Sequence, residues 1–566
     1  MTKIELSSFL SLSFLVFIVL FTRLGFLFDI TITPYSLVLS FVTFCSLVVF
    51  LFTLVPVARL TLKSKLVSLS GFIVISIVVF FLSYPLARTF DLSWDGQGYH
   101  QTAIIALYDG WNPLKTDTIS LKQTLPSQIF AEGYPSALWE IQANIYAAVG
   151  QINAAKVTNI ALALIALGFL YSLLRTLTFG KFPAFVTSLL IVLQPVFLIQ
   201  LLTYMQDGLG YQLILIALSS LILLMLKPKS HWPIVAFLFI ELLLVSTKYS
   251  HLPVALLLGG FAFLVLVNRY LNKEFLFTKK KWLVIILLVG ISGVFAYLPY
   301  GRNAIVHQAL FYPTNIQELM GSVTYNNVPR NLNEHDKLGL LLYGMFSRSQ
   351  TAMSGDPTNK ENIATLKVPF TFSMQELTDG GRQFNNRVGA GGPLYSGLIL
   401  LSFALLIVMS FAAQSQKERY AIYAAYIIVG LLLFLALLTP TPNLLRYTNQ
   451  LQLIPFAVLI PLYAVFKRPL VKVIAGLTLI LIAMNVTFFT YGVYQNNILE
   501  NEKMNRQFAE MRDSGETYHV RAQHFYSNYV LLDEQNVPFT IVNDLDCTVE
   551  VKDLVSSSNT THYCSE

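Results

Sequence analysis

Long apolar runs separated by short polar stretches dominate the pattern of this chain. A helix that crosses about 30 Å of hydrocarbon needs roughly 20 apolar residues. Thirteen runs meet or approach that length and predict membrane-spanning helices: 7–27, 35–57, 67–87, 155–175, 183–203, 208–226, 231–247, 251–268, 282–300, 393–413, 420–439, 449–466 and 473–494. The first run lacks a small-residue cleavage site, so it is interpreted as a retained span. The pattern predicts an all-α polytopic membrane protein with about 13 transmembrane helices.

Basic residues collect in alternate loops, and this asymmetry predicts the orientation. With the N-terminus in the cytoplasm, the inner loops hold 18 basic and three acidic residues, whereas the rest of the chain holds 20 basic and 28 acidic. One further apolar stretch, 135–150, is short and contains Glu140. Counting it as a span would move Arg175 and Lys181 outside, so it is predicted to be a helix on, or partly sunk into, the outer interface.

This topology leaves the C-terminus and all the larger non-membrane segments on the outer side: 88–154, 301–392 and 495–566. Two domains are predicted, a transmembrane domain over 1–494 and a small external domain over 495–566. The external domain is expected to begin with a polar helix near 497–512 and to contain strand-like runs such as 537–542. It also holds Cys547 and Cys564, and the compartment permits a disulfide, although the sequence leaves their pairing open.

The composition agrees with a membrane protein and excludes several other classes. Apolar residues make up 55% of the chain and charged residues 12%, about half the charged share of a soluble protein, and the mean hydropathy is +0.61. These values exclude a disordered chain, a secreted disulfide scaffold and a nucleic-acid-binding module. The isoelectric point near 9.0 does not indicate nucleic-acid binding, because the basic residues are segregated by loop.

The first outer segment carries the densest group of reactive side chains. Asp91, Asp95, Tyr99 and His100 follow directly after a predicted span, in the run Phe-Asp-Leu-Ser-Trp-Asp-Gly-Gln-Gly-Tyr-His. A carboxylate beside a glycine turn at the membrane surface can act as a general base or hold a divalent cation. The alternative is that Asp95 caps the next helix and the aromatic residues are membrane-interface anchors. The sequence leaves both interpretations open.

The helix after this run is predicted to lie at the interface, since one face carries Ile104, Leu107, Tyr108 and Trp111. Arg23 and Glu241 lie within predicted spans, and both are interpreted as structural polar groups.

Further charged residues are predicted at the same outer level. Asp207 and Lys248, the latter followed by Tyr249, lie in outer turns between spans. Arg302 opens the long outer loop, and Arg446 lies in the short loop 440–448. Arginine suits an anionic phosphate because its planar fork can bind two oxygens at once. Any one of these charges is weak evidence, and their shared level is the stronger indication. The histidines show no zinc-ligand spacing, and no serine-hydrolase motif is present.

Over most of residues 67–466 the ordered set of these motifs resembles the GT-C class of integral-membrane glycosyltransferases. The resemblance is strongest to the branch that contains protein O-mannosyltransferases and lipid A aminoarabinose transferases. The matching elements, in order, are Asp91 or Asp95, Tyr134-Pro135, Asp207, Lys248-Tyr249-Ser250, Tyr300-Gly301-Arg302-Asn303 with Tyr312-Pro313, and Arg446-Tyr447. The Trp-Trp-Asp motif of oligosaccharyltransferase catalytic subunits is missing, which argues against transfer of whole oligosaccharides to asparagine.

The resemblance implies a GT-C fold and transfer of one sugar from a polyprenyl-phosphate donor to an acceptor outside the cytoplasmic membrane. The acceptor is a glycan, lipid or protein, with a cell-surface polysaccharide or its lipid-linked precursor favoured. Under this resemblance Asp95, with Asp91 as its rival, is the base, and Asp207 orients the acceptor or a cation. Donor phosphate is assigned to Lys248, Arg302 and Arg446, and substrate contacts to Tyr99, His100 and Tyr249.

Several points stay open at this stage. No cofactor is certain, and a divalent cation such as Mg²⁺ or Mn²⁺ would have Asp95 and Asp207 as ligands. The glycines at 389, 391 and 392 either let the outer loop close over the donor or merely turn the chain. The main alternative function is a transporter or flippase, although no internal repeat is evident and transporters favour midplane charges. A structural subunit would leave the acidic first outer segment without a role.

Overall fold

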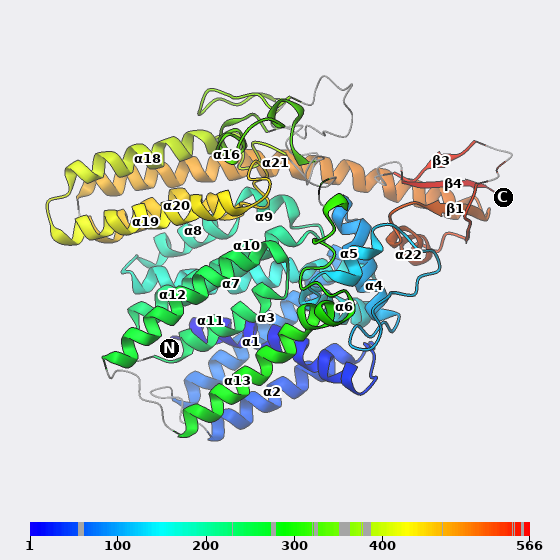
Figure 1. Cartoon of the computed structure of the whole chain (residues 1–566), viewed down its shortest axis with the longest axis horizontal. Coiled ribbons are helices and arrows are strands. Elements are labelled where there is room, and N and C mark those ends of the chain that lie inside the picture. Colours follow the sequence, from blue (N-terminus) through cyan, green and yellow to red (C-terminus); the bar gives the residue numbers. More distant parts are fainter. Residues whose placement is uncertain are drawn as a thin grey trace.

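The computed structural model describes residues 1–54, 61–228, 230–272, 279–319, 321, 327–349, 363–374, 376, 387–466, 468–545, 547, 550–555 and 560–565. The described chain is mainly helical, with long helices side by side and a small sheet at one end (Figure 1). The loop residues Arg59, Lys229, Lys273, Glu274 and Lys467, which contribute to the predicted charge asymmetry, lie outside the described residues.

Each of the thirteen predicted spans coincides with helical structure. The helices at these positions are α1 (Lys3–Leu27), α2 (Ser36–Leu54), α3 (Leu62–Ala87), α7 (Val157–Thr176), α8 (Lys181–Val192), α9 (Pro195–Gln200), α10 (Gln206–Leu226), α11 (Trp232–Val245), α12 (Leu252–Leu271), α13 (Lys279–Ala296), α18 (Tyr395–Ala412), α19 (Gln416–Leu438), α20 (Ile454–Val465) and α21 (Pro469–Asp513). Among the described residues, nine helices are long and apolar enough to cross a membrane. A polytopic membrane protein is therefore confirmed.

Of the four remaining predicted spans, the run 282–300 corresponds to the 18-residue helix α13, and the other three correspond to shorter pieces of helix. The run 183–203 is divided into α8 and α9, with Gln194 extended between them. Pro195 explains the break, because proline disfavours helical geometry in the residue before it and lacks the N–H that a continuing helix needs. Helix α11 has 14 residues, and α20 has 12 residues preceded by the 3₁₀ turn η6 (Asn449–Leu453).

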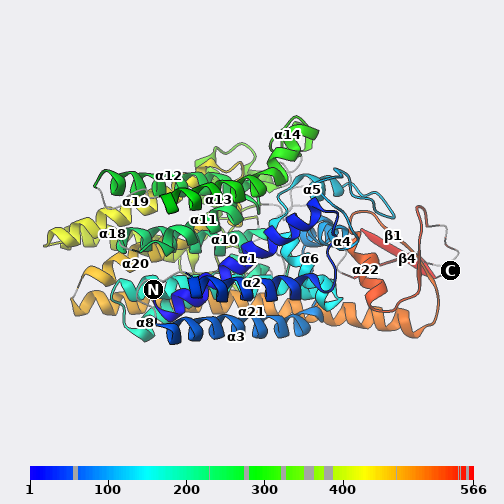
Figure 2. The same ribbon diagram turned by 90° about the horizontal axis from the view of Figure 1, so that it is seen from below.

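The segments predicted to be external gather at the end of the molecule that carries the C-terminus, and the N-terminus lies toward the opposite end (Figures 1 and 2). The gathered elements are η1 (Gly96–His100), α4 (Gln101–Tyr108), α5 (Gln128–Gly133), α6 (Ala137–Val149), η2 (Ile152–Lys156), η3 (Tyr249–His251), η4 (Tyr297–Gly301), α14 (Arg302–Val306), η5 (Arg330–Leu332) and α16 (Lys337–Phe346). We call this the outer end, after the sequence prediction.

Two helices predicted to lie at the interface are instead buried inside the protein. Helix α6 packs against α1, α2 and α4, and its Glu140 is fully buried. Arg23 of α1 explains this burial, since its guanidinium binds both Glu140 oxygens, at 3.0 and 3.1 Å from Nε. Helix α4 was also predicted from one apolar face, but every residue of Gln101–Leu107 is buried, because α6 and the C-terminal region cover it. The structural interpretation of Arg23 is supported by this pair.

The C-terminal region adds a small mixed domain to the helical body. Its sheet has the order β2-β1-β4-β3, built from β1 (Tyr518–Ala522), β2 (Phe539–Ile541), β3 (Lys552–Asp553) and β4 (Thr561–Ser565). Strand β1 runs parallel to β2 and antiparallel to β4, and α22 (Ser527–Glu534) packs on η1 and α4.

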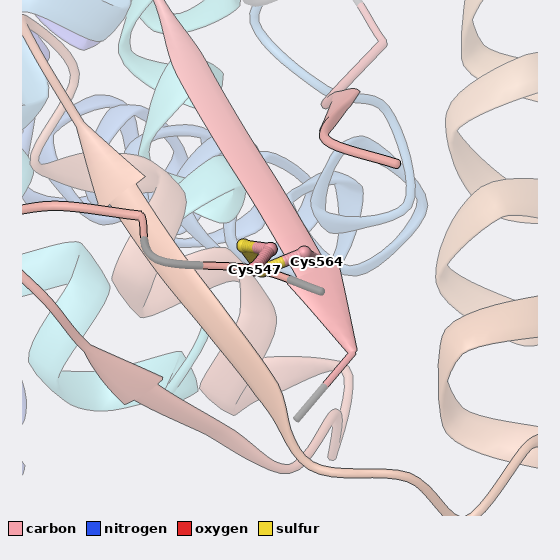
Figure 3. Close-up of a disulfide and its surroundings, with 2 residues drawn as sticks. All are labelled: Cys547 and Cys564. Carbon is pink, nitrogen blue, oxygen red and sulfur yellow. A yellow bond between two sulfur atoms is a disulfide. The ribbon is translucent and has the colours of Figure 1, made fainter. Parts of the chain in front are cut away.

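One long helix joins this domain to the helical body. Helix α21 has 45 residues and runs through the predicted boundary at 494 without a break, so span and domain share one helix (Figure 2). Cys547 and Cys564 form a disulfide that closes the end of the sheet (Figure 3). The pairing that the sequence left open is therefore present.

Candidate functional site

A charged cluster at the outer end brings together four segments that are far apart in the chain. Asp95 precedes η1, Asp207 lies in the first turn of α10, Lys248 precedes η3 and Arg446 lies between α19 and η6. Arg446 Nη1 lies 2.7 Å from Asp95 Oδ2 and 3.8 Å from Asp207 Oδ2. Lys248 Nζ lies 2.5 Å from Asp207 Oδ1. All four residues were predicted as site residues from the sequence, and we call them the charged cluster.

The carboxylates differ in accessibility, and the difference separates their possible roles. The side chain of Asp95 is 17% exposed, whereas that of Asp207 is 1% exposed, and Asp91 is equally buried. Burial alone would raise the pKa of Asp95, but the positive charges of Arg446 and Lys248 outweigh it and hold that pKa below its usual value. Asp95 is therefore an ionised carboxylate that another molecule can reach.

Asp91 holds the loop that carries Asp95. Its Oδ1 accepts hydrogen bonds from the backbone N–H and hydroxyl of Ser93, at 2.8 and 2.7 Å, and its Oδ2 accepts from the backbone N–H of Tyr204, at 2.7 Å. Burial raises the pKa of Asp91. A Cβ at Gly96 would lie 1.9 Å from Asp91 Oδ2, so only glycine fits there. Asp91 thus fastens the Asp95 loop to the segment before α10.

Asp95 does not cap the helix that follows it. Asp95 stands at the N-cap position of η1, but its side chain makes no capping hydrogen bond. Its carboxylate binds Arg446 instead.

Aromatic rings pack around the charged cluster. Tyr99 packs against Tyr134 and His100, with ring centroids 5.7 and 4.3 Å apart. Lys248 Nζ and the Arg446 guanidinium both lie over the ring of Tyr447, at 4.9 and 4.7 Å. Such faces attract cations, so Tyr447 helps to hold the two cations side by side.

His100 is held in its neutral form by its surroundings. Its Nδ1 accepts a hydrogen bond from the indole N–H of Trp139 at 2.9 Å, which leaves the proton on Nε2. Burial lowers the pKa of His100 to about 3. His100 is therefore a hydrogen-bond donor at neutral pH, and it carries no positive charge in the cluster.

Arg302 and Tyr249, also predicted as site residues, instead hold a neighbouring loop. Arg302 donates through Nη1 to the carbonyl of Glu132 at 3.0 Å and through Nη2 to the carbonyl of Asp117 at 2.5 Å. The Tyr249 hydroxyl lies 2.8 Å from the Gly133 carbonyl and accepts from Asn303 at 2.9 Å. These contacts fasten the 117–133 segment, and the ring of Tyr249 reaches the cluster only through Tyr134, 5.7 Å away.

Sequence reasoning missed a third cation beside the cluster. Arg387 is 6% exposed, and its neighbour Arg446, together with burial, lowers the pKa of Arg387 to about 10. The only sequence signal was the glycine-rich stretch that follows it. Gly389 and Gly392 have φ of +66° and +97°, so both glycines turn the chain before α18 in the described structure.

An apolar groove lies on the helical body. It has a volume of about 590 Å³ and is lined by residues of η3, α12 and α19 and by Phe311: Tyr249, Leu252, Pro253, Leu256, Leu257, Phe311, Phe434, Leu435 and Leu438. Leu256 and Phe434 are 68% and 54% exposed, so the groove opens on the surface of the helical body. Its lining residue Tyr249 follows Lys248 in the chain, and the ring of Tyr249 packs on that of Tyr134, 5.7 Å away.

The donor set of the cluster bears on a divalent cation. Arg446 Nη1 contacts both Asp95 and Asp207, the two ligands that the sequence suggested. Among the residues that the structure describes, no group of three or more His, Cys, Asp or Glu side chains is arranged to hold a metal ion. A divalent cation at these carboxylates therefore stays a prediction.

The charged cluster, its aromatic packing and the groove are the features that a function has to explain. No protein-family model, no curated protein and no solved structure matches this chain.

Proposed function

We propose that the chain is a membrane glycosyltransferase that moves one sugar from a polyprenyl-phosphate donor to an acceptor at the outer end. The observation that carries the proposal is the charged cluster at the outer end, in which Lys248 and Arg446 pair with Asp207 and with the partly exposed Asp95. A lipid-linked sugar phosphate needs cations for its phosphate and an apolar surface for its chain. The cluster offers the cations, and the apolar groove lined by Tyr249, α12 and α19 is the surface proposed for the chain.

Asp95 is the proposed base. It is ionised at neutral pH and partly exposed, so it can accept the proton of an acceptor hydroxyl. The oxygen attacks the anomeric carbon as the bond to the phosphate oxygen breaks, and the configuration inverts. The proton goes to Asp95, and the bonding electron pair leaves with the phosphate. General-base catalysis of this kind typically contributes 10²–10⁴-fold in rate.

The cations have a separate proposed role. Lys248 and Arg446 lie where positive charge would stabilise the phosphate as it leaves, and such preorganised charge is often the largest catalytic contribution. Their ion pairs with Asp207 and Asp95 hold them in place before a donor arrives. His100, a neutral donor, is proposed to bind a sugar hydroxyl. Asp207, buried and doubly paired, is proposed to orient the cations.

The fold family of this proposal is the GT-C class, on the strength of the motif resemblance. The acceptor is proposed to be a cell-surface glycan or its lipid-linked precursor. The membrane is proposed to be the cytoplasmic membrane, with the N-terminus inside and the outer end outside. Labelling of single cysteines by an impermeant reagent tests this orientation: in a Cys45→Ser background, Glu516→Cys should react in intact cells and Lys417→Cys should not. The reverse pattern would overturn it.

Donor chemistry tests the activity. Purified protein is incubated with a polyprenyl-phosphate sugar labelled in the sugar, together with extracted cell-surface glycan. Release of free polyprenyl phosphate with label in the glycan supports the proposal. A transporter or flippase would leave the donor intact while moving it between leaflets of a vesicle, and that outcome would replace the proposal with its main alternative.

A further inference from the structure

The side chain of Arg387 is buried without the partners that a buried guanidinium normally has. Its Nε and Nη1 have no hydrogen-bond partner among the described residues. Buried polar groups nearly always have one, and an exception calls for an explanation such as an absent ligand. Arg446 adds a third open donor nitrogen, since its Nε is also without a partner in the described structure.

The backbone around Arg387 is fixed on two sides. Asn443 donates through Nδ2 to the Arg387 carbonyl at 3.0 Å, which ties it to the loop that carries Arg446. A Cβ at Gly389 would lie 2.7 Å from the backbone of Ser347 and Arg348, so glycine permits this close approach. Arg446, Tyr447 and Asp95 are near enough to act electrostatically on its guanidinium. The backbone of Arg387 is therefore held in place, while its Nε and Nη1 have no hydrogen-bond partner among the described residues.

The formal charges of the site give a further constraint. Lys248, Arg446 and Arg387 carry three positive charges, and Asp95 and Asp207 carry two negative ones, which leaves one positive charge. His100 is neutral and does not change this balance. A site with one excess cation and three open N–H donors is suited to a singly charged oxyanion.

We propose that Arg387, together with Arg446, binds the donor phosphate, and that the net charge of the completed site fits a monophosphate-linked sugar better than a diphosphate-linked one. This inference rests on the proposed function. A phosphodiester donor carries one negative charge and neutralises the site. During transfer Asp95 takes the acceptor proton and loses its charge, while the phosphate becomes a dianion. The three cations then face three negative charges, one on Asp207 and two on the phosphate, so the occupied site is neutral before and after the reaction.

A diphosphate-linked donor would carry one more negative charge at every step. It would leave the buried site with an uncompensated anion both before and after transfer, and uncompensated buried charge is costly. Arg387 is needed for this balance, since without its charge even the monophosphate donor would leave one negative charge uncompensated.

Binding of sugar-free polyprenyl phosphate to the full-length purified protein tests the inference. Arg387→Gln should weaken binding about tenfold or more, Arg387→Lys should weaken it less, and Arg348→Gln, a change at an exposed arginine of the same outer segment, should leave it unchanged. Asp95→Asn, which removes the charge that protonation would remove, should tighten binding of the phosphate dianion. Wild-type protein should bind polyprenyl diphosphate no more tightly than the monophosphate. Equal monophosphate affinity of wild type and Arg387→Gln, or tighter binding of the diphosphate by wild type, would overturn the inference.

Thermal unfolding without ligand separates this role from a structural one. Because Arg387→Gln removes a buried charge without a partner, the variant should be at least as stable as wild type. A clear loss of stability would mean that Arg387 supports the fold, and would also overturn the inference. Intact donor in the transfer assay, with normal phosphate binding by wild type, would instead refute the proposed function while the Arg387 result stands.

Discussion

Two buried ion-pair sites in this protein are built in opposite ways. In the pair between Arg23 and Glu140, every guanidinium nitrogen and both carboxylate oxygens have partners, including the Val294 carbonyl 2.9 Å from Nη1. At the outer end, Arg446 and Arg387 keep open N–H donors, and Asp207 Oδ2 has no hydrogen-bond partner among the described residues.

This difference separates charges that stabilise the fold from charges that a ligand would complete. A satisfied pair joins two helices and is complete without any other molecule. A cluster with unfilled donors is costly unless something else fills it, since a buried polar group without a partner costs about 1–3 kcal/mol. We infer that the first site is structural and that the second is completed by a ligand. Four experiments test this contrast between the structural pair and the charged cluster.

The largest effect is expected for Asp95→Asn in the transfer assay. The amide keeps the size of the side chain but cannot take a proton at neutral pH, so the transfer rate should fall 10²–10⁴-fold, with the protein still folded in the membrane. Asp91→Asn is the matched comparison, and it should lower folded yield, since Asp91 holds the loop through three hydrogen bonds.

Two results would contradict the assignment of the base. If Asp95→Asn is active while folded Asp91→Asn is inactive, the base is Asp91. If both variants turn over at wild-type rates, neither carboxylate is the base.

The second experiment breaks the structural pair. Arg23→Met leaves Glu140 buried without its partner and should destabilise the protein by about 3–5 kcal/mol, measured by unfolding in detergent. Replacing both partners, with Arg23→Met and Glu140→Leu together, should recover most of that loss, because no buried charge remains. A single variant as stable as wild type would show that Arg23 and Glu140 contribute nothing to the fold, and the contrast with the charged cluster would fail.

The third experiment compares two cations that the sequence treated alike. Lys248→Met should weaken donor binding about tenfold, since its ammonium lies in the charged cluster. The sequence predicts a similar loss, about 1.5–3 kcal/mol, for Arg302→Ala. The contacts of Arg302 with the Glu132 and Asp117 carbonyls predict lower stability instead. Donor titration and unfolding of both variants decide between these expectations, and unchanged affinity in Arg302→Ala would make it a structural anchor.

The smallest effect concerns a half-buried acid. Glu534 of α22 accepts a hydrogen bond from the backbone N–H of Ile152 at 2.7 Å, and burial raises the pKa of Glu534 to about 7. A raised pKa in the folded state means that the protonated form is the favoured one there. This contribution to stability is therefore present below about pH 4.5, the usual value, and is lost as the pH rises through about 7.

Glu534→Gln should remove this pH dependence. The unfolding temperature of wild type, relative to that of the variant, should fall between pH 4.5 and 7, and Asp533→Asn, a change at an exposed neighbour, should leave the trend in place. Parallel curves for wild type and Glu534→Gln would show that Glu534 does not titrate in this range. Nearby cations lower the pKa of Asp95, whereas burial raises that of Glu534. Parallel curves would contradict this difference between the two carboxylates.

Much of the helical pattern was predictable from the sequence. Apolar runs of sufficient length form helices because the bilayer leaves no other way to satisfy backbone N–H and C=O groups. The structure differs from this pattern where a residue interrupts an apolar run, as Pro195 does in the run 183–203. Helix α6 was misplaced because Glu140 made it resemble a surface helix, and its partner Arg23 lies 117 residues earlier.

The charged cluster shows where sequence reasoning ends. Asp95, Asp207, Lys248 and Arg446 were recognisable because charges next to apolar runs are rare and costly, so each one carries information by itself. Their pairing was not predictable, and neither was the separation of Arg302 from them, because pairing depends on how distant helices pack. Arg387 gave almost no signal, since an arginine in a polar loop is ordinary until folding buries it.

The apolar runs of the sequence are enough to identify a polytopic helical membrane protein, and the charges beside them mark the unusual loops. Both conclusions follow from the cost of placing polar groups in hydrocarbon. The tertiary structure is needed to show which charges pair, which carboxylate stays accessible and which donors remain open. Those properties depend on contacts between segments as far apart as Asp95 and Arg446, 351 residues along the chain, and on the burial that packing imposes on them.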